Sequence, residues 1–273
     1  MNWPTIARKE FRDVRRSKTL WALFAVVTFV LAVPILTQSG SPQQTDLTAL
    51  EGALSSLVTL GTLLFPIAVL VTSYNSVTGE LESGSATFLL GLPNTRLEAI
   101  VGKLVGRTAV TSLGFGAAFG VGGVLLLVKF GTIPVVTYVA LAALAMYFAA
   151  VWTSIGIAIS ALAGSRGRSL ACTLGTYLLF VLGWIILLQP RKLASYVVES
   201  LLGLGAMPEV YDLVFRLSPT TAYAFASNGV ISGTDGTGAF FLQEWFMVLI
   251  LLFWLLGPIT LGYLRFRSSE LAG

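Results

Sequence analysis

The sequence predicts an all-α integral membrane protein with about six transmembrane helices. Apolar residues make up 55% of its 273 positions and charged residues only 11%, whereas soluble domains carry roughly a quarter charged residues. A helix needs about 20 apolar residues to cross a hydrocarbon core of about 30 Å. The stretches that meet this length without Asp, Glu, Lys or Arg are 19–37, 54–74, 108–128, 135–163, 170–189 and 245–264. We expect residues 1–273 to form a single transmembrane domain.

The positions of the basic residues predict the orientation of these spans. Thirteen of the 17 Lys and Arg residues fall in the segments that share one side: 1–18, 75–107, 164–169 and 265–273. Lys and Arg concentrate in cytoplasmic loops. We therefore expect a multi-pass protein of the cell membrane with both termini in the cytoplasm. This placement explains the net charge of +4 without nucleic acid as a partner.

The segment before the first span predicts an amphipathic helix on the cytoplasmic membrane surface. Trp3, Ala7, Phe11 and Val14 recur at helical spacing, while basic residues occupy the other faces. Such helices lie in the membrane interface, in contact with lipid. A basic tail that only fixes the topology would account for the same charges.

The connection 75–107 predicts two short cytoplasmic helices that meet near 92–94. Glu80 and Glu82 stand early in the first half, where acidic residues favour a helix start, and Pro93 should end that helix. Thr95 and Glu98 then have the spacing of a capping box, which predicts a second helix that runs into the third span. A passive amphipathic hairpin at the membrane surface fits the same pattern.

Segment 190–244 predicts a long external loop. Leu193, Val197, Leu201 and Leu204 form an apolar stripe typical of an interfacial helix. Within the spans, Gly116 and Gly120 form a GxxxG pair, and Gly156, Ser160 and Gly164 form a series of small residues. Such spacing allows close helix packing, within the subunit or across a dimer.

The residue types and motifs that the sequence lacks exclude several classes of function. Histidine is absent, and Cys172, the single cysteine, is expected to be a small core residue. These counts exclude zinc sites and Cys/His nucleophilic pairs, so we predict no catalytic residue, no metal site and no cofactor. Uncharged spans disfavour an ion-coupled transporter. No GxxxxGK[ST] pattern is present, so the chain would not hydrolyse ATP alone.

The string GELESGSATFLLGLPNTRLEAIVGK, at 79–103, resembles the cytoplasmic signature of the type-2 ABC exporter permeases. Segments 7–19 and 217–230 also look like parts of that family. The chain looks closest to its compact permeases, which include the one serving nitrous oxide reductase maturation.

This resemblance implies the membrane subunit of an ATP-driven exporter, which pairs with a second permease subunit as a homodimer or a close heterodimer. Two copies of a separate ABC ATPase subunit would bind ATP and Mg. The residues expected at the ATPase contact are Glu80, Glu82, Gly84, Pro93, Arg96, Arg166 and Arg168. A non-transporting scaffold for a partner complex is the alternative function, and the sequence identifies neither the substrate nor the transport direction.

Overall fold

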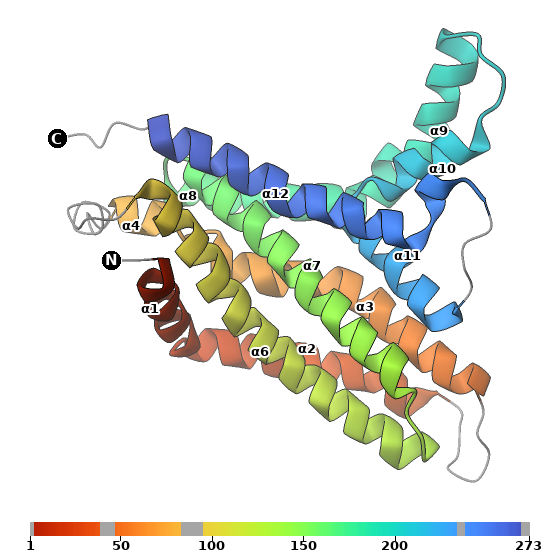
Figure 1. Ribbon diagram of the computed structural model, residues 1–273, viewed down its shortest axis with the longest axis horizontal. Coiled ribbons are helices and arrows are strands. Elements are labelled where there is room, and N and C mark those ends of the chain that lie inside the picture. The colour runs from red at the N-terminus through yellow and green to blue at the C-terminus, as the bar shows by residue number, and fades with distance from the viewer. Residues whose placement is uncertain (1–2, 39–46, 83–94, 234–237, 269–273) are drawn as a thin grey trace.

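The computed structural model describes residues 3–38, 47–82, 95–233 and 238–268, and these residues form helices without any strand (Figure 1). The long helices are α2 (Lys18–Thr37), α3 (Leu47–Ser73), α6 (Arg96–Phe130), α7 (Val135–Leu162) and α12 (Glu244–Ser268). The shorter elements are α1 (Trp3–Arg15), α4 (Thr78–Glu82), α8 (Arg166–Tyr177), the π-helical η1 (Leu178–Leu188), α9 (Pro190–Ser195), η2 (Tyr196–Leu201), α10 (Pro208–Arg216), α11 (Pro219–Ser232) and η3 (Phe240–Leu242).

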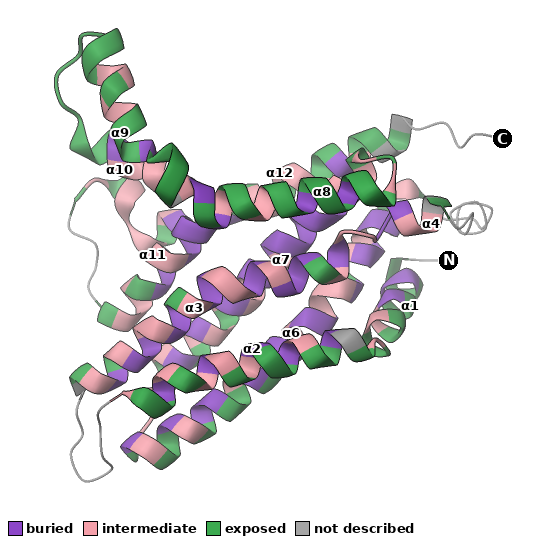
Figure 2. Ribbon diagram, turned by 180° about the vertical axis from the view of Figure 1, so that it is seen from behind, coloured by how far each residue is buried: buried purple, intermediate pink, exposed green. Residues whose placement is uncertain are grey.

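The described residues include 5 helices that are long and apolar enough to cross a membrane. A bent pair, Arg166–Trp184 and Ile186–Leu201, gives up to 6 if it counts as one span. The predicted all-α membrane fold is therefore confirmed. Burial is concentrated on the inward faces of these helices, and much of their outer surface is apolar and exposed (Figure 2).

The helix geometry of the fifth span is interrupted at Gln189 and Pro190. Pro190 has no N–H with which to serve the Ile186 carbonyl oxygen four residues earlier, so regular helix geometry cannot continue there. Gln189, at φ 40°, takes a left-handed conformation, and its side-chain amide donates to that carbonyl at 3.3 Å. The bend of 54° between the two parts of the pair lies earlier, between Trp184 and Ile186.

Glycines and aromatic rings pack the bundle interior. The Phe24 ring of α2 lies against Gly114 of α6 so closely that a Cβ atom there would come within 2.4 Å of it. Phe24 in turn contacts Phe115, with ring centroids 5.8 Å apart. Because lipid tails are as apolar as the side chains, such close van der Waals contact replaces the hydrophobic effect as the force between helices.

Segment 190–244 differs from the external loop that the sequence predicted. Helix α11 packs against α3, α7 and α12, and its Tyr223 ring stacks on Phe148 with centroids 4.2 Å apart and planes 5° apart. Ser218 caps α11 by accepting from the Thr220 N–H at 3.3 Å. The predicted apolar stripe is exposed at Leu193, Leu201 and Leu204.

Two other predictions have clear outcomes. The capping box at the start of α6 is confirmed: the Thr95 side chain accepts from the Glu98 N–H, and the Glu98 carboxylate accepts from the Thr95 N–H. The assignment of Cys172 to the core is wrong, because it lies exposed on α8. An apolar neighbourhood in the sequence of a membrane helix does not separate its inward face from its outward face.

Candidate functional site

The charged end of the molecule gathers segments that are far apart in the sequence. It consists of α1, α4, the first turns of α6 and α8, and the last turn of α12 (Figure 1). Most of the charged side chains of the described residues lie on these elements. The charged end is thus where most of the charged side chains of the described residues gather.

A buried ionic cluster joins α1, α4 and α6. The Lys103 ammonium of α6 lies 2.9 Å from a Glu10 carboxylate oxygen of α1 and 2.7 Å from a Glu80 carboxylate oxygen of α4. The Lys103 and Glu10 side chains are 3% and 4% exposed. Lys9 lies 3.1 Å from the second Glu80 oxygen. A buried charge is tolerated only when it is paired in this way.

Arg107 extends this ionic cluster to the end of α3. Its guanidinium donates to the Glu10 carboxylate at 2.9 Å and also donates to the Thr72 carbonyl oxygen. The carbonyl groups in the last turn of a helix lack intrahelical partners. Arg107 therefore both balances Glu10 and ties the end of α3 to α6.

The cluster shifts the pKa values of its members outside the spans. Burial alone would raise the pKa of Glu10, but the positive charges of Lys103 and Arg107 outweigh it, so this pKa lies below its ordinary value of 4.5. Burial opposes the charge on Lys9, and Glu80 outweighs that effect, so the Lys9 pKa is raised. Both groups are therefore charged at neutral pH.

Two glycines allow α1 to lie directly on α6. A Cβ atom at Gly102 would come within 2.7 Å of Ile6 Cβ. One at Gly106 would come within 2.5 Å of the Ala7 carbonyl oxygen. Gly102 and Gly106 form a GxxxG pair that the sequence reasoning did not single out, and it brings Glu10 within reach of Lys103.

Helix α7 holds the start of α4 through residues that the sequence singled out for packing. Ser160 Oγ accepts from the Val77 N–H at 3.0 Å and the Thr78 N–H at 3.1 Å. A Cβ atom at Gly156 would come within 2.6 Å of Ser73 Cβ. The turn between α3 and α4 is consequently fixed against α7.

The other predicted contact residues are only partly brought together. The Glu82 carboxylate accepts from the Arg166 N–H at 2.8 Å, which joins α4 to α8. Arg96 donates to the Arg267 carbonyl oxygen at 2.8 Å, at the end of α12. Arg168 is exposed on the first turn of α8. Gly84 and Pro93 lie outside the described residues.

The predicted GxxxG pair of the third span makes little contact within the chain. A Cβ atom at Gly116 would meet only Met146 Cε, at 3.5 Å, and one at Gly120 would meet nothing within 4 Å. The close contacts of α6 fall instead at Gly102, Gly106, Gly114 and Gly122. GxxxG spacing alone does not identify which glycine face meets a neighbour.

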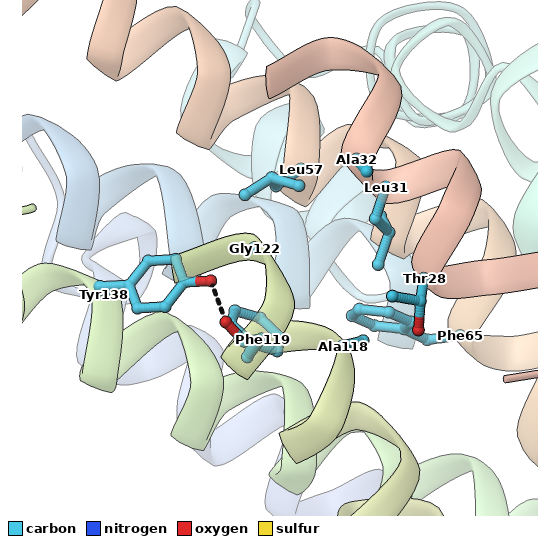
Figure 3. A pocket seen from close by; sticks show the side chains of 9 residues that line it. All are labelled: Thr28, Leu31, Ala32, Leu57, Phe65, Ala118, Phe119, Gly122 and Tyr138. Carbon is cyan, nitrogen blue, oxygen red and sulfur yellow. Dashed lines mark hydrogen bonds between the residues drawn. The ribbon is translucent and has the colours of Figure 1, made fainter. Parts of the chain in front are cut away.

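A small cavity lies inside the bundle between α2, α3, α6 and α7 (Figure 3). Its volume is about 10 Å³, which is room for about one water molecule. The Tyr138 hydroxyl donates to the Phe119 carbonyl oxygen at 2.6 Å beside it. A solute cannot pass through this cavity in the conformation described.

Of the residues in the ionic cluster, the sequence analysis identified Glu80 as a candidate functional residue and missed Glu10. Glu10 is an acidic residue within a basic helix, and that isolated sign was the available signal. Its partners Lys103 and Arg107 lie 93 and 97 positions away in the chain. Charge spacing along one helix could not reveal contacts of that range.

Comparison with known proteins places the chain in a family. The ABC-2 family transporter protein model matches residues 4–271. The probable ABC transporter permease protein NosY of Stutzerimonas stutzeri is 28% identical over 249 residues, which cover 86% of this chain and 83% of that protein. The protein of the same name from Pseudomonas aeruginosa is 28% identical over 251 residues, with the same two shares. The chain therefore belongs to the ABC-2 transporter family and is a multi-pass membrane subunit of an ABC transporter.

Proposed function

We propose that this permease couples ATP hydrolysis by a separate subunit to the export of a solute. The observation that carries the proposal is the ionic cluster of Lys9, Glu10, Glu80, Lys103 and Arg107, which joins α4 to α1 and α6. A coupling element must be bound firmly to the spans that it moves. Helix α4 meets this requirement through charge-assisted contacts, which are stronger than neutral hydrogen bonds.

In this proposal the ATPase pushes on α4 and on the segment that follows it. Glu80 fixes α4 to α1 and α6, because its carboxylate is bound by Lys9 and Lys103. Movement of α4 then acts on α6 through Lys103 and on α7 through Ser160. Rigid helices can convert such a displacement into an alternation between two bundle arrangements.

Glu82, Arg96, Arg166 and Arg168 are proposed to face the ATPase, together with Gly84 and Pro93. Glu82 and Arg168 are exposed, so they are available to a partner. Two ATPase copies would hold ATP and Mg, while a second permease subunit, identical to this one, would complete the transport path. The charged end would lie in the cytoplasm with both chain termini, and the bundle would lie in the cell membrane, in keeping with the excess of basic residues there.

The ATPase contact can be tested by charge reversal at Glu82. The permease would be purified from native membranes with its ATPase, and the molar ratio and ATPase rate of the complex would be measured. Glu82→Arg should weaken the association about tenfold, which corresponds to ~1.4 kcal/mol. Glu209→Arg, on the exposed start of α10, is the matched control and should leave the complex intact.

Three outcomes decide the proposal. Failure of the wild-type chain to recover any ABC ATPase would overturn it, and equal association for the two variants would overturn the role of Glu82. A complex that assembles but shows no solute flux when ATP is hydrolysed would favour a non-transporting scaffold. Light scattering of the purified permease gives the subunit number, and a single subunit mass would exclude the homodimer.

A further inference from the structure

A polar cavity of about 400 Å³ lies beside the ionic cluster at the charged end. It is bounded by the junction of α1 and α2, the end of α3, and the starts of α6 and α8. Its polar lining comprises Ser17, Thr72, Tyr74, Asn75, Arg107 and Arg166. This volume falls within the range of about 300–1,000 Å³ that is typical of ligand sites.

The electrostatics of this polar cavity favour an anion. Arg107 and Arg166 line it, and no acidic residue does. Glu10 balances Arg107, whereas the Arg166 guanidinium makes no ion pair within the described part of the chain. The nearby Glu82 carboxylate is engaged by the Arg166 backbone N–H. Glu82 keeps its negative charge nearby, but within the described residues no carboxylate pairs with the exposed Arg166 guanidinium, so this guanidinium can make a charge-assisted contact with an anion.

An apolar cavity of about 230 Å³ adjoins the polar one, and the two share Val71 and Tyr74. It runs between α3 and α8, where Leu70 and Leu174 contribute apolar walls. The shared lining makes one amphipathic recess with a cationic end and an apolar end. A free inorganic anion would occupy only the first of these.

A buried hydroxyl lies at the apolar end of the recess. Thr173 lines the apolar cavity, is 4% exposed, and its Oγ1 atom has no hydrogen-bond partner among the described residues. A buried hydroxyl without a partner is costly. Thr173 follows Arg166 by two turns of α8, which is about 10 Å along the helix axis. A ligand with an ester oxygen below its anionic group could accept from this hydroxyl.

We propose that this recess binds an anionic phospholipid from the membrane leaflet at the charged end. The phosphate group pairs with Arg166, a glycerol ester oxygen accepts a hydrogen bond from Thr173, and one acyl chain lies along Leu70 and Leu174 between α3 and α8. This assignment goes beyond the proposed export function and does not depend on it, and it gives the Arg166 side chain a lipid phosphate as its partner in place of the ATPase. Its test needs neither the ATPase nor the transported solute.

The experiment is a lipid titration of the full-length permease in detergent, monitored by native mass spectrometry. The probes are phosphatidylglycerol, phosphatidylcholine and soluble glycerol phosphate. Phosphatidylglycerol should bind most tightly. Arg166→Gln should weaken its binding about tenfold and Thr173→Val about fivefold, as expected for one charged and one neutral hydrogen bond.

Matched controls come from the same helix. Arg168→Gln and Thr176→Val alter residues of α8 that line neither cavity, so phosphatidylglycerol should bind these variants as it binds the wild type. Thr173→Val removes an unsatisfied hydroxyl, so it should not lower the melting temperature of the lipid-free protein. Lost lipid affinity without lost stability separates binding from a structural effect.

Several results would overturn the proposal. Equal affinity of phosphatidylcholine would remove the role of the negative charge. Effective competition by glycerol phosphate, together with an unchanged Thr173→Val variant, would show a site for a free anion. Equal phosphatidylglycerol affinity in Arg166→Gln and Arg168→Gln would show that the lipid binds elsewhere.

Discussion

The charged end and the bundle interior are held together by different forces. At the charged end, α1, α4 and α6 are joined by Glu10, Glu80 and Lys103 through contacts of 2.7–2.9 Å. In the interior, a glycine notch receives Phe24, and Phe148 stacks on Tyr223. Ionic contacts depend on the presence of every partner, whereas packing depends on shape.

The contacts of the two regions also differ in how readily they can rearrange. Interdigitated side chains have few alternative arrangements because protein interiors are close-packed. Ion pairs can exchange partners with little change in volume, since Lys103 already contacts two carboxylates. Substitutions in the two regions should therefore fail in distinct ways.

The largest effect is expected from Lys103→Met, which leaves the buried Glu10 with Arg107 alone and removes one Glu80 partner. Loss of one member of a buried ionic group costs about 3 kcal/mol or more. Lys129→Met is the control, because Lys129 lies on the same helix, is only partly buried and contacts only a carbonyl oxygen at Leu36 among the described polar partners. Denaturant unfolding in detergent measures both, and equal losses would show that the cluster does not stabilise the charged end.

A smaller loss is expected from Gly106→Ala, which forces α1 away from α6. The added methyl group would lie 2.5 Å from the Ala7 carbonyl oxygen, and overpacking of this kind costs about 1–3 kcal/mol. Gly120→Ala places the same group in open space and should be neutral or stabilise the helix. Melting temperatures compare the two variants, and a similar decrease in both would contradict the packing of α1 on α6.

In the bundle interior, two coupled substitutions should each lower the free energy of unfolding by about 1 kcal/mol. Tyr138→Phe removes the hydrogen bond to the Phe119 carbonyl oxygen, which is worth about 0.5–1.5 kcal/mol. Gly122→Ala would place a Cβ atom 2.8 Å from the Tyr138 hydroxyl. It should destabilise the wild type more than the Tyr138→Phe variant. A double-mutant cycle measures this coupling, and additive effects would contradict the close contact.

The last prediction concerns pH, which should change stability little near neutral pH because Glu10 stays charged there. Its folded-state pKa lies below 4.5, so its contribution to stability is fully present above about 4.5 and is lost as the pH falls through the folded-state pKa. Melting temperature against pH should decline more steeply below about pH 4.5 in the wild type than in Glu10→Gln. Parallel curves would show that Glu10 is not stabilised by its charge.

The sequence by itself determined the spans, the helix start at Thr95 and the basic character of one end. These features depend on residues close together in the chain, because hydropathy, capping and charge excess are local properties. Only the tertiary structure decided that Glu10 meets Lys103, that α11 packs within the bundle, and that Gly102 and Gly106, rather than Gly120, contact a neighbouring helix. These contacts depend on which face of each helix packs against a neighbouring helix. In a membrane the packed face and the lipid-facing face are both apolar, so hydropathy does not identify the packed face.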